Sequence, residues 1–211
     1  EAPVAALKFG EYSFPDLSGR RLSRNVFHFR TMEYQPSLVK RKIVFSNVGV
    51  EATELFGQCP KGGFFWRITL EAKCHPPFYV NRKFYTIVTL GCSSAKVSEH
   101  TSNSILKIHL GKKSLFIASE SNRYGIYSCV EEYLDDLEKG TIHTRRKTGR
   151  HVVFEKDVAL KPGGQVSLLF GISFQSPEKA AGALRLKNPV SSIRVKWNKW
   201  FNSLPAPSFE T

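Results

Sequence analysis

Several signatures of common protein classes are absent from this chain of 211 residues. No apolar run approaches the roughly 20 residues that cross a bilayer, so the sequence predicts no transmembrane helix and no membrane partner. Residues 1–3 do not begin a secretory signal, although a signal removed earlier would leave no trace. Glycine-rich nucleotide-binding motifs and the G-x-S-x-G nucleophile motif are also missing. The sequence therefore does not support assignment to nucleotide-dependent enzymes or α/β-hydrolases.

The sequence also lacks the spacing of cysteines and histidines that is typical of metal sites and disulfide-rich domains. No two of the four cysteines have the C-x-x-C spacing of zinc ribbons, and a chain of this length does not need disulfides. We expect mostly buried free thiols and a cytoplasmic protein. The six histidines do not pair at metal-ligand spacing within one element, so we predict no metal and no cofactor. The cysteines are Cys59, Cys74, Cys92 and Cys129.

Acidic residues are few, and the 31 Lys and Arg against 18 Asp and Glu give a net charge of +13. Such a balance raises the question of a nucleic-acid or other polyanionic partner. The basic clusters are scattered, which is more typical of solvated strand faces and turns, so nucleic acid is not the favoured partner. The clusters are residues 20–24, 40–42, 112–113 and 145–150.

Hydrophobic residues make up 41% of the chain, enough for a real core, and most of them fall in strand-like patterns. The clearest strand is 64–72, where Phe64, Trp66 and Ile68 alternate with polar or outward positions. Residues 105–118 predict a hairpin, and residues 151–174 predict a second one around the Pro162–Gly164 turn. Further strand candidates are 26–30, 39–45, 84–90 and 124–130, while the first 25 residues look irregular.

Helical patterns are short and mostly C-terminal. Residues 131–140 predict one short helix, with acidic residues at its start and Gly140 at its end. Ser176 and Pro177 begin a second helix that runs to about residue 188. Residues 193–205 form the last, with Ser191 or Ser192 as its N-cap.

Many strands followed by two helices argue against a parallel α/β sheet. The sequence predicts a mainly β protein: an antiparallel β-sandwich, supersandwich-like, followed by two C-terminal α-helices. We place the sandwich domain at residues 1–175 and a helical linker at residues 176–211.

The last helix carries an unusual load of large apolar side chains on one face. They are Ile193, Trp197, Trp200, Phe201 and Leu204. This face must be buried, either on the sheet of this chain or on a partner domain. Residues 206–211 have the composition of a linker.

The candidate catalytic groups are carboxylates. Five of them crowd residues 131–138, but a solvated helix gives neither the burial nor the opposed geometry that glycoside hydrolysis requires. Glu71 and Glu155 lie among cations on strands and are interpreted as paired surface charges. We predict no catalytic residue. Exposed rings that could stack on sugars are Phe65, Phe78 and Tyr79, whereas Trp66 is expected in the core.

The last third of the chain resembles the front part of glycoside hydrolases with an (α/α)6 barrel, the glucoamylase-like, trehalase-like and family 63 glucosidase-like enzymes. In those proteins an apolar strand, a Leu-x-Pro-Gly turn, another strand, a P-E-x-A helix and a Trp-rich helix precede the barrel. The matching segments here are 158–164, 166–174, 176–181 and 197–205.

The resemblance implies that this chain is a non-catalytic N-terminal β-sandwich domain or subunit of an α-glycosidase. Its general acid and base would belong to the barrel, which this chain lacks, and the sandwich would pack on the barrel and help shape its substrate pocket. The resemblance implies that Trp197, Trp200, Phe201 and Leu204 contact this barrel. Two alternatives remain open: a stand-alone carbohydrate- or polyanion-binding module, and a nucleic-acid-binding protein.

Overall fold

The computed structural model describes residues 8–13, 27–35, 38–45, 49–60, 62–73, 80–90, 95–99, 105–121, 123–143, 147–186 and 189–203. Their strands form two sheets, and all the strand pairings within them are antiparallel. The four-stranded sheet A has the order β1 (Lys8–Ser13), β6 (Val80–Thr89), β12 (His151–Leu160) and β10 (Arg123–Tyr127). The nine-stranded sheet B has the order β11 (Thr148–Gly149), β7 (Ala95–Glu99), β8 (Ile105–Leu110), β9 (Lys113–Ser119), β13 (Gln165–Ser173), β5 (Phe64–Ala72), β4 (Val50–Gln58), β3 (Leu38–Phe45) and β2 (Phe27–Gln35). The predicted fold class, an antiparallel sandwich with two C-terminal helices, is confirmed.

The main core lies between the two sheets. On β5 the side chains of Trp66, Ile68 and Leu70 are buried and those of Arg67 and Thr69 are only half-buried, as the alternation predicted. Aromatic rings link the layers, because Phe170 of β13 packs against both Trp66 (4.9 Å between centroids) and Phe154 of β12 (5.2 Å). Burial of each such ring contributes about 2–3 kcal/mol, which makes this cluster the main source of cohesion between the sheets.

The predicted hairpin of β12 and β13 is wrong. β12 pairs with β6 and β10 in sheet A, whereas β13 pairs with β5 and β9 in sheet B. The turn reverses the chain at Gly163, whose φ of +69° suits glycine, but it carries the chain from one sheet to the other. The hairpin of β8 and β9 is confirmed, with Leu110 opposite Lys113.

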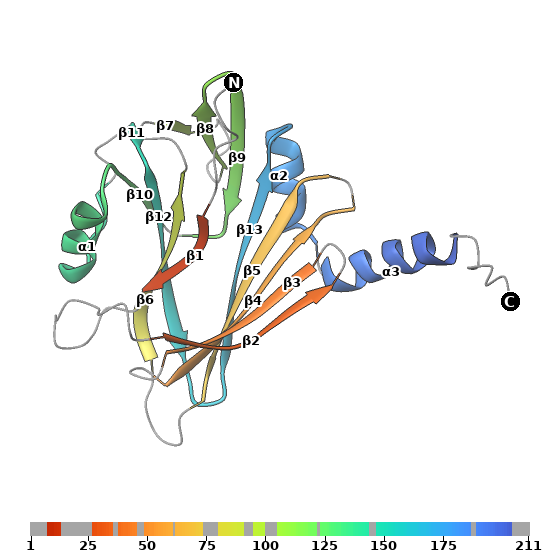
Figure 1. The fold of residues 1–211 in the computed structure, drawn as a ribbon. Coiled ribbons are helices and arrows are strands. Elements are labelled where there is room, and N and C mark those ends of the chain that lie inside the picture. Colours follow the sequence, from red (N-terminus) through yellow and green to blue (C-terminus); the bar gives the residue numbers. More distant parts are fainter. Residues whose placement is uncertain are drawn as a thin grey trace, which may run out of the picture.

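Helices cover the outer faces of both sheets (Figure 1). The helix α1 (Val130–Glu138) packs Tyr133 and Leu137 on sheet A, against Tyr85 and Val153. The helix α2 (Pro177–Leu184) lies on β13 and β9 of sheet B, and α3 (Pro189–Asn202) begins on the same sheet and extends beyond it. No helix among the described segments is both long and apolar enough to span a membrane.

The contact between α2 and β13 depends on the absence of a side chain at Gly171. A Cβ atom there would lie 1.9 Å from the carbonyl oxygen of Ala180, far inside van der Waals contact. Ala180 and Ala183 are themselves buried at this contact. Small residues on both elements therefore let the helix axis approach the strand closely.

Helix boundaries agree only in part with the prediction. The cap of α2 is confirmed, since the hydroxyl of Ser176 accepts a hydrogen bond from the amide of Lys179 (3.4 Å). This helix ends at Leu184, earlier than expected. α3 begins at Pro189 rather than after Ser191 or Ser192, because the fixed φ of proline suits the first helical position.

Candidate functional site

The first half of α3 packs on the outer face of sheet B. Ile193 is 4% exposed and joins a cluster with Phe65 of β5, Leu169 of β13 and Ala183 of α2. Val190 and Trp197 are half-buried against the same cluster. One part of the apolar stripe of α3 is therefore covered by this chain itself.

Farther along the helix, the stripe is open to solvent at Trp200. Trp200 is 49% exposed, and its ring meets the half-buried ring of Trp197 edge to face, with 5.1 Å between centroids. Figure 1 shows the reason: α3 projects past the edge of the sheet, so none of the described strands lies beneath its last turns. Of the predicted interface residues, the side chain of Phe201 and all of Leu204 lie outside the described part of the chain.

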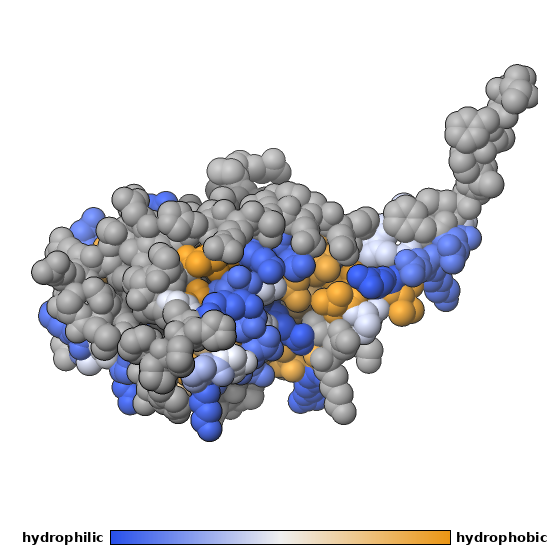
Figure 2. Space-filling model, turned by 90° about the horizontal axis from the view of Figure 1, so that it is seen from below, coloured by the Kyte–Doolittle hydropathy of each residue, from blue (hydrophilic) through white to orange (hydrophobic). Residues whose placement is uncertain are grey.

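A hollow of about 290 Å³ lies along one side of α3. The described residues that line it come from consecutive turns of the helix: Val190, Ser191, Arg194, Val195 and Asn198. Val195 is 69% exposed, so this side of the helix is also open. Figure 2 shows hydrophobic and hydrophilic residues side by side where the helix leaves the body of the molecule.

The prediction that Phe65 contacts carbohydrate is wrong. Its side chain is 0% exposed because Ala183 of α2 and Ile193 of α3 pack in the same cluster on the outer face of β5. The alternation along β5 correctly predicts that this ring points away from the main core. It cannot show that helices from the last part of the sequence pack over the ring. Phe78 and Tyr79 lie outside the described residues.

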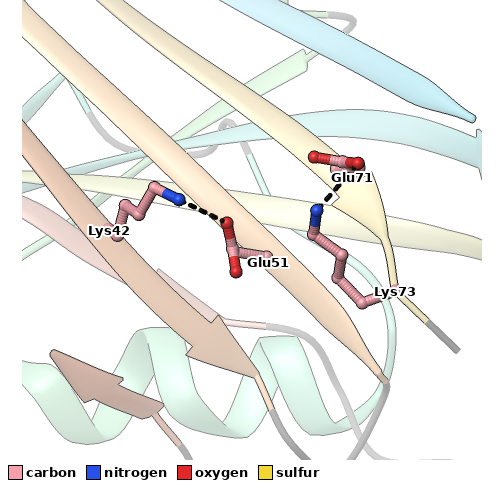
Figure 3. A network of polar contacts seen from close by, with 4 residues as sticks. All are labelled: Lys42, Glu51, Glu71 and Lys73. Carbon is pink, nitrogen blue, oxygen red and sulfur yellow. Dashed lines mark hydrogen bonds and ion pairs between the residues drawn. The ribbon is translucent and has the colours of Figure 1, made fainter. Parts of the chain in front are cut away.

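Two carboxylates stand opposite each other on the outer face of sheet B. Glu51 of β4 and Glu71 of β5 are register partners, and each binds a lysine (Figure 3): Glu51 binds Lys42 (3.2 Å) and Glu71 binds Lys73 (2.9 Å). The hydrogen bond from Lys73 lowers the pKa of Glu71. A general acid requires a raised pKa, so this pair is unsuited to glycoside hydrolysis. The interpretation of Glu71 as a paired surface charge is supported by this geometry.

Glu155 does not belong to the surface. Only 2% of this residue is exposed, and it lies on β12 at the outer face of sheet A. The Nζ atom of Lys83 lies 3.4 Å from its Oε1 atom. Lys83 also donates to the carbonyl oxygen of Gly140 (2.7 Å), at the end of α1. Burial, together with the nearby carboxylate of Glu155, raises the pKa of Tyr85. Lys83, whose side chain is half-buried, thus links the end of α1 to the buried carboxylate on the sheet.

The acidic helix α1 is only partly solvated, contrary to expectation. Glu131 and Asp135 are exposed, but Asp136 accepts a hydrogen bond from the phenol of Tyr127 (2.9 Å). The amide of His143 donates to the same phenol oxygen (3.2 Å). Burial, with the hydrogen bond to Asp136, raises the pKa of Tyr127. Asp136 thus serves to hold α1 in place, and no metal-binding group of three or more ligands occurs in the described segments.

The basic clusters do not form one surface. Arg41 forms an ion pair with Glu54, which also accepts from the indole of Trp66 (2.6 Å), while Lys42 points to the opposite face. Residues 147–150 surround β11 at the far edge of sheet B, seven strand positions from β3 in the order of the sheet. Arg145 and Arg146 lie outside the described residues. The continuous basic face that nucleic-acid binding requires is therefore not assembled from the described members of these clusters.

The cysteine prediction holds for one of the two described thiols. Cys59 is free and buried, and burial raises its pKa to about 11. Cys129 is free but exposed, immediately before α1. Cys74 and Cys92 lie outside the described residues.

Among known proteins, similarity to this chain is found in solved structures. No protein-family model matches the sequence, and no curated protein matches it. Among solved structures, a putative kojibiose phosphorylase from the human microbiome matches with a TM-score of 0.44 and 10% sequence identity. The match covers 78% of this chain and 23% of that protein, so the chain spans less than a quarter of its length.

Proposed function

We propose that this chain is the non-catalytic β-sandwich part of an α-glycosidase whose (α/α)6 barrel packs on α3. Residues 1–175 would form the sandwich and residues 176–211 the helical segment that leads to the barrel. Glycoside hydrolysis would take place in the barrel, and the sandwich would support it and contribute to the rim of its substrate pocket.

The observation that carries the proposal is the half-covered stripe of α3. Ile193 and Trp197 use its first half to fix the helix on sheet B, while Trp200 continues the same stripe into solvent. A tryptophan buries 150–250 Å² when fully covered, so covering the solvent-exposed half of Trp200 contributes about 2–3 kcal/mol. Such a ring on a projecting helix is well placed to anchor an interface.

The order of elements gives further support. An antiparallel sandwich ends in β13, and the capped helix α2 and the Trp-bearing helix α3 follow directly. This is the order of elements that precedes the barrel in the glycosidases which the sequence resembles. The buried Phe65 and the separated basic clusters give no reason to prefer a carbohydrate-binding or nucleic-acid-binding module.

Hydrogen exchange tests the proposal. Amide exchange across 198–202 is measured by mass spectrometry in the 211-residue chain and in the protein that carries this sequence in its source cells. We expect these amides to exchange about 100-fold more slowly in the native protein, because a partner covers the end of α3. The turn at Gly111 and Lys112 serves as the control and should exchange equally in both. Equal exchange across 198–202 would contradict the proposal.

A further inference from the structure

The free half of α3 is bordered by positive charge. Arg194, Lys196 and Lys199 are all exposed, and α3 contains no acidic residue. At 3.6 residues per turn, Arg194 lies at one edge of the apolar stripe and Lys196 at the other, with Lys199 beside Lys196. Any surface that covers Trp200 therefore meets a cation on each side.

The elements next to α3 extend this charge. On sheet B, Arg67 is a register partner of Leu55, which packs against the cluster beneath α3. Lys40, the other register partner of Leu55, lies opposite Glu33 of β2. α2 adds the exposed Lys179 and Arg185 against one carboxylate, Glu178. The carboxylate of Glu120 is directed at the backbone, since it accepts a hydrogen bond from the amide of Leu169 (3.1 Å). The positive charge around α3 is thus only partly balanced by these neighbours.

The hollow beside α3 places one of these positive charges, that of Arg194, in a defined position. Arg194 is the only charged residue among the described residues that line it, and the other four supply apolar surface, one hydroxyl and one amide. A guanidinium binds a carboxylate through two parallel hydrogen bonds, which a lysine cannot reproduce. The hollow is large enough for an acidic side chain of a partner to reach this group.

From these features we infer that the surface which covers the end of α3 is an apolar groove with carboxylates along its rim, one of which binds Arg194 in the hollow. The inference rests on the proposed function and specifies the chemistry of the partner. An anionic membrane is the less suitable partner, because Ile193 and Trp197 already pack on sheet B and leave only the last turns of the helix free. Interfacial helices use an apolar face along their whole length.

Zero-length crosslinking tests the inference directly. A carbodiimide joins a lysine amine to a carboxylate only where the two are in contact. In the native protein from the source cells, we expect Lys196 and Lys199 to be linked to Asp or Glu residues outside this 211-residue sequence. Lys112, an exposed lysine in the turn between β8 and β9, is the matched control and should form no such link.

Charge variants give the second measurement. R194E should weaken the protection of residues 198–202 in the native protein about tenfold, and R194K about threefold, because lysine keeps the charge but loses the paired hydrogen bonds. K112E makes the same charge change far from α3 and should have no effect. Raising NaCl from 50 to 500 mM should reduce the protection in the same direction.

The outcomes separate the inference from the proposed function. Protected amides in α3 with no links from Lys196 or Lys199, and no effect of R194E, would overturn the inference while leaving docking intact. Unprotected amides would overturn both. Links only to carboxylates within residues 1–211, or binding of the chain to vesicles with 30% phosphatidylserine together with unprotected amides in solution, would also overturn the inference.

Discussion

Trp197 and Trp200 lie one turn apart on α3, and their rings meet edge to face at 5.1 Å, yet the first is half-buried on sheet B and the second is 49% exposed. The same apolar stripe therefore has two different surroundings. Its first part stabilises this chain, and its second part is available to another surface.

This difference predicts unequal effects of two similar substitutions on the 211-residue chain. W197A should lower the free energy of unfolding by about 2 kcal/mol, because it removes a ring packed on the cluster of Phe65 and Ile193. W200A should lower it by less than about 1 kcal/mol, because its ring is half in solvent already. Urea unfolding measures both values. Equal losses would show that Trp200 serves the sandwich rather than a partner.

The close packing of α2 on β13 predicts a large effect of one methyl group. G171A should cost about 3 kcal/mol or more, because its Cβ would displace the backbone of α2 at Ala180. The matched control is G182A in α2, where no atom of a neighbouring element lies within 4 Å of the added Cβ. This control should be neutral or stabilise by about 0.5–1 kcal/mol. A small effect of G171A in thermal or urea unfolding would contradict the described contact.

The contacts of Glu54 with Arg41 and the buried Trp66 predict that loss of this carboxylate strongly lowers the free energy of unfolding. E54A would leave the indole N–H of Trp66 without its acceptor and Arg41 without this carboxylate, at a cost of about 3–5 kcal/mol. E54Q keeps an oxygen acceptor for Trp66 and should cost less. Unfolding of both variants in urea gives the comparison. A loss below about 1 kcal/mol in E54A would show that the pair contributes little.

The raised pKa of Tyr85 predicts a loss of stability at alkaline pH. Below about pH 10 the phenol is protonated in both the folded and the unfolded chain, so it adds no pH dependence. Above this pH the unfolded chain releases the proton while the folded chain retains it, so stability falls by about 1.4 kcal/mol per pH unit. Y85F should flatten this fall between pH 10 and 11.5. Parallel curves for Y85F and the wild type would show that Tyr85 does not cause it.

Local patterns predicted the elements whose signals lie within a few residues. The alternation along β5, the hairpin of β8 and β9 and the cap at Ser176 depend on neighbouring side chains, and all three are confirmed. The strands β1, β4, β7 and β11 were not predicted. In β4 the apolar alternation is interrupted by Glu54, which is nevertheless buried. Its carboxylate is tolerated there because it binds Trp66 and Arg41 from neighbouring strands.

Errors arose where distant segments decide the outcome. A Pro-Gly-Gly turn predicts a reversal of the chain, but it does not determine whether β13 pairs with β12 or crosses to the other sheet. Phe65 is predicted to be available for a ligand because the helices that pack over it, α2 and α3, lie more than 110 residues later in the sequence. Glu155 looked like a surface charge because the sequence does not show that α1 covers its face of sheet A. The Trp-rich face of α3, in contrast, was recognisable from spacing alone.

We propose above that this sequence belongs to an α-glycosidase whose helical barrel covers the end of α3. The most direct measurement is the intact mass and full sequence of the native protein in its source cells, together with its hydrolysis of α-glycosides. We predict either a much longer polypeptide with an (α/α)6 barrel after residue 211, or a barrel subunit bound in equal amount. A native protein of 211 residues, without such a subunit and without α-glycosidase activity, would contradict the account.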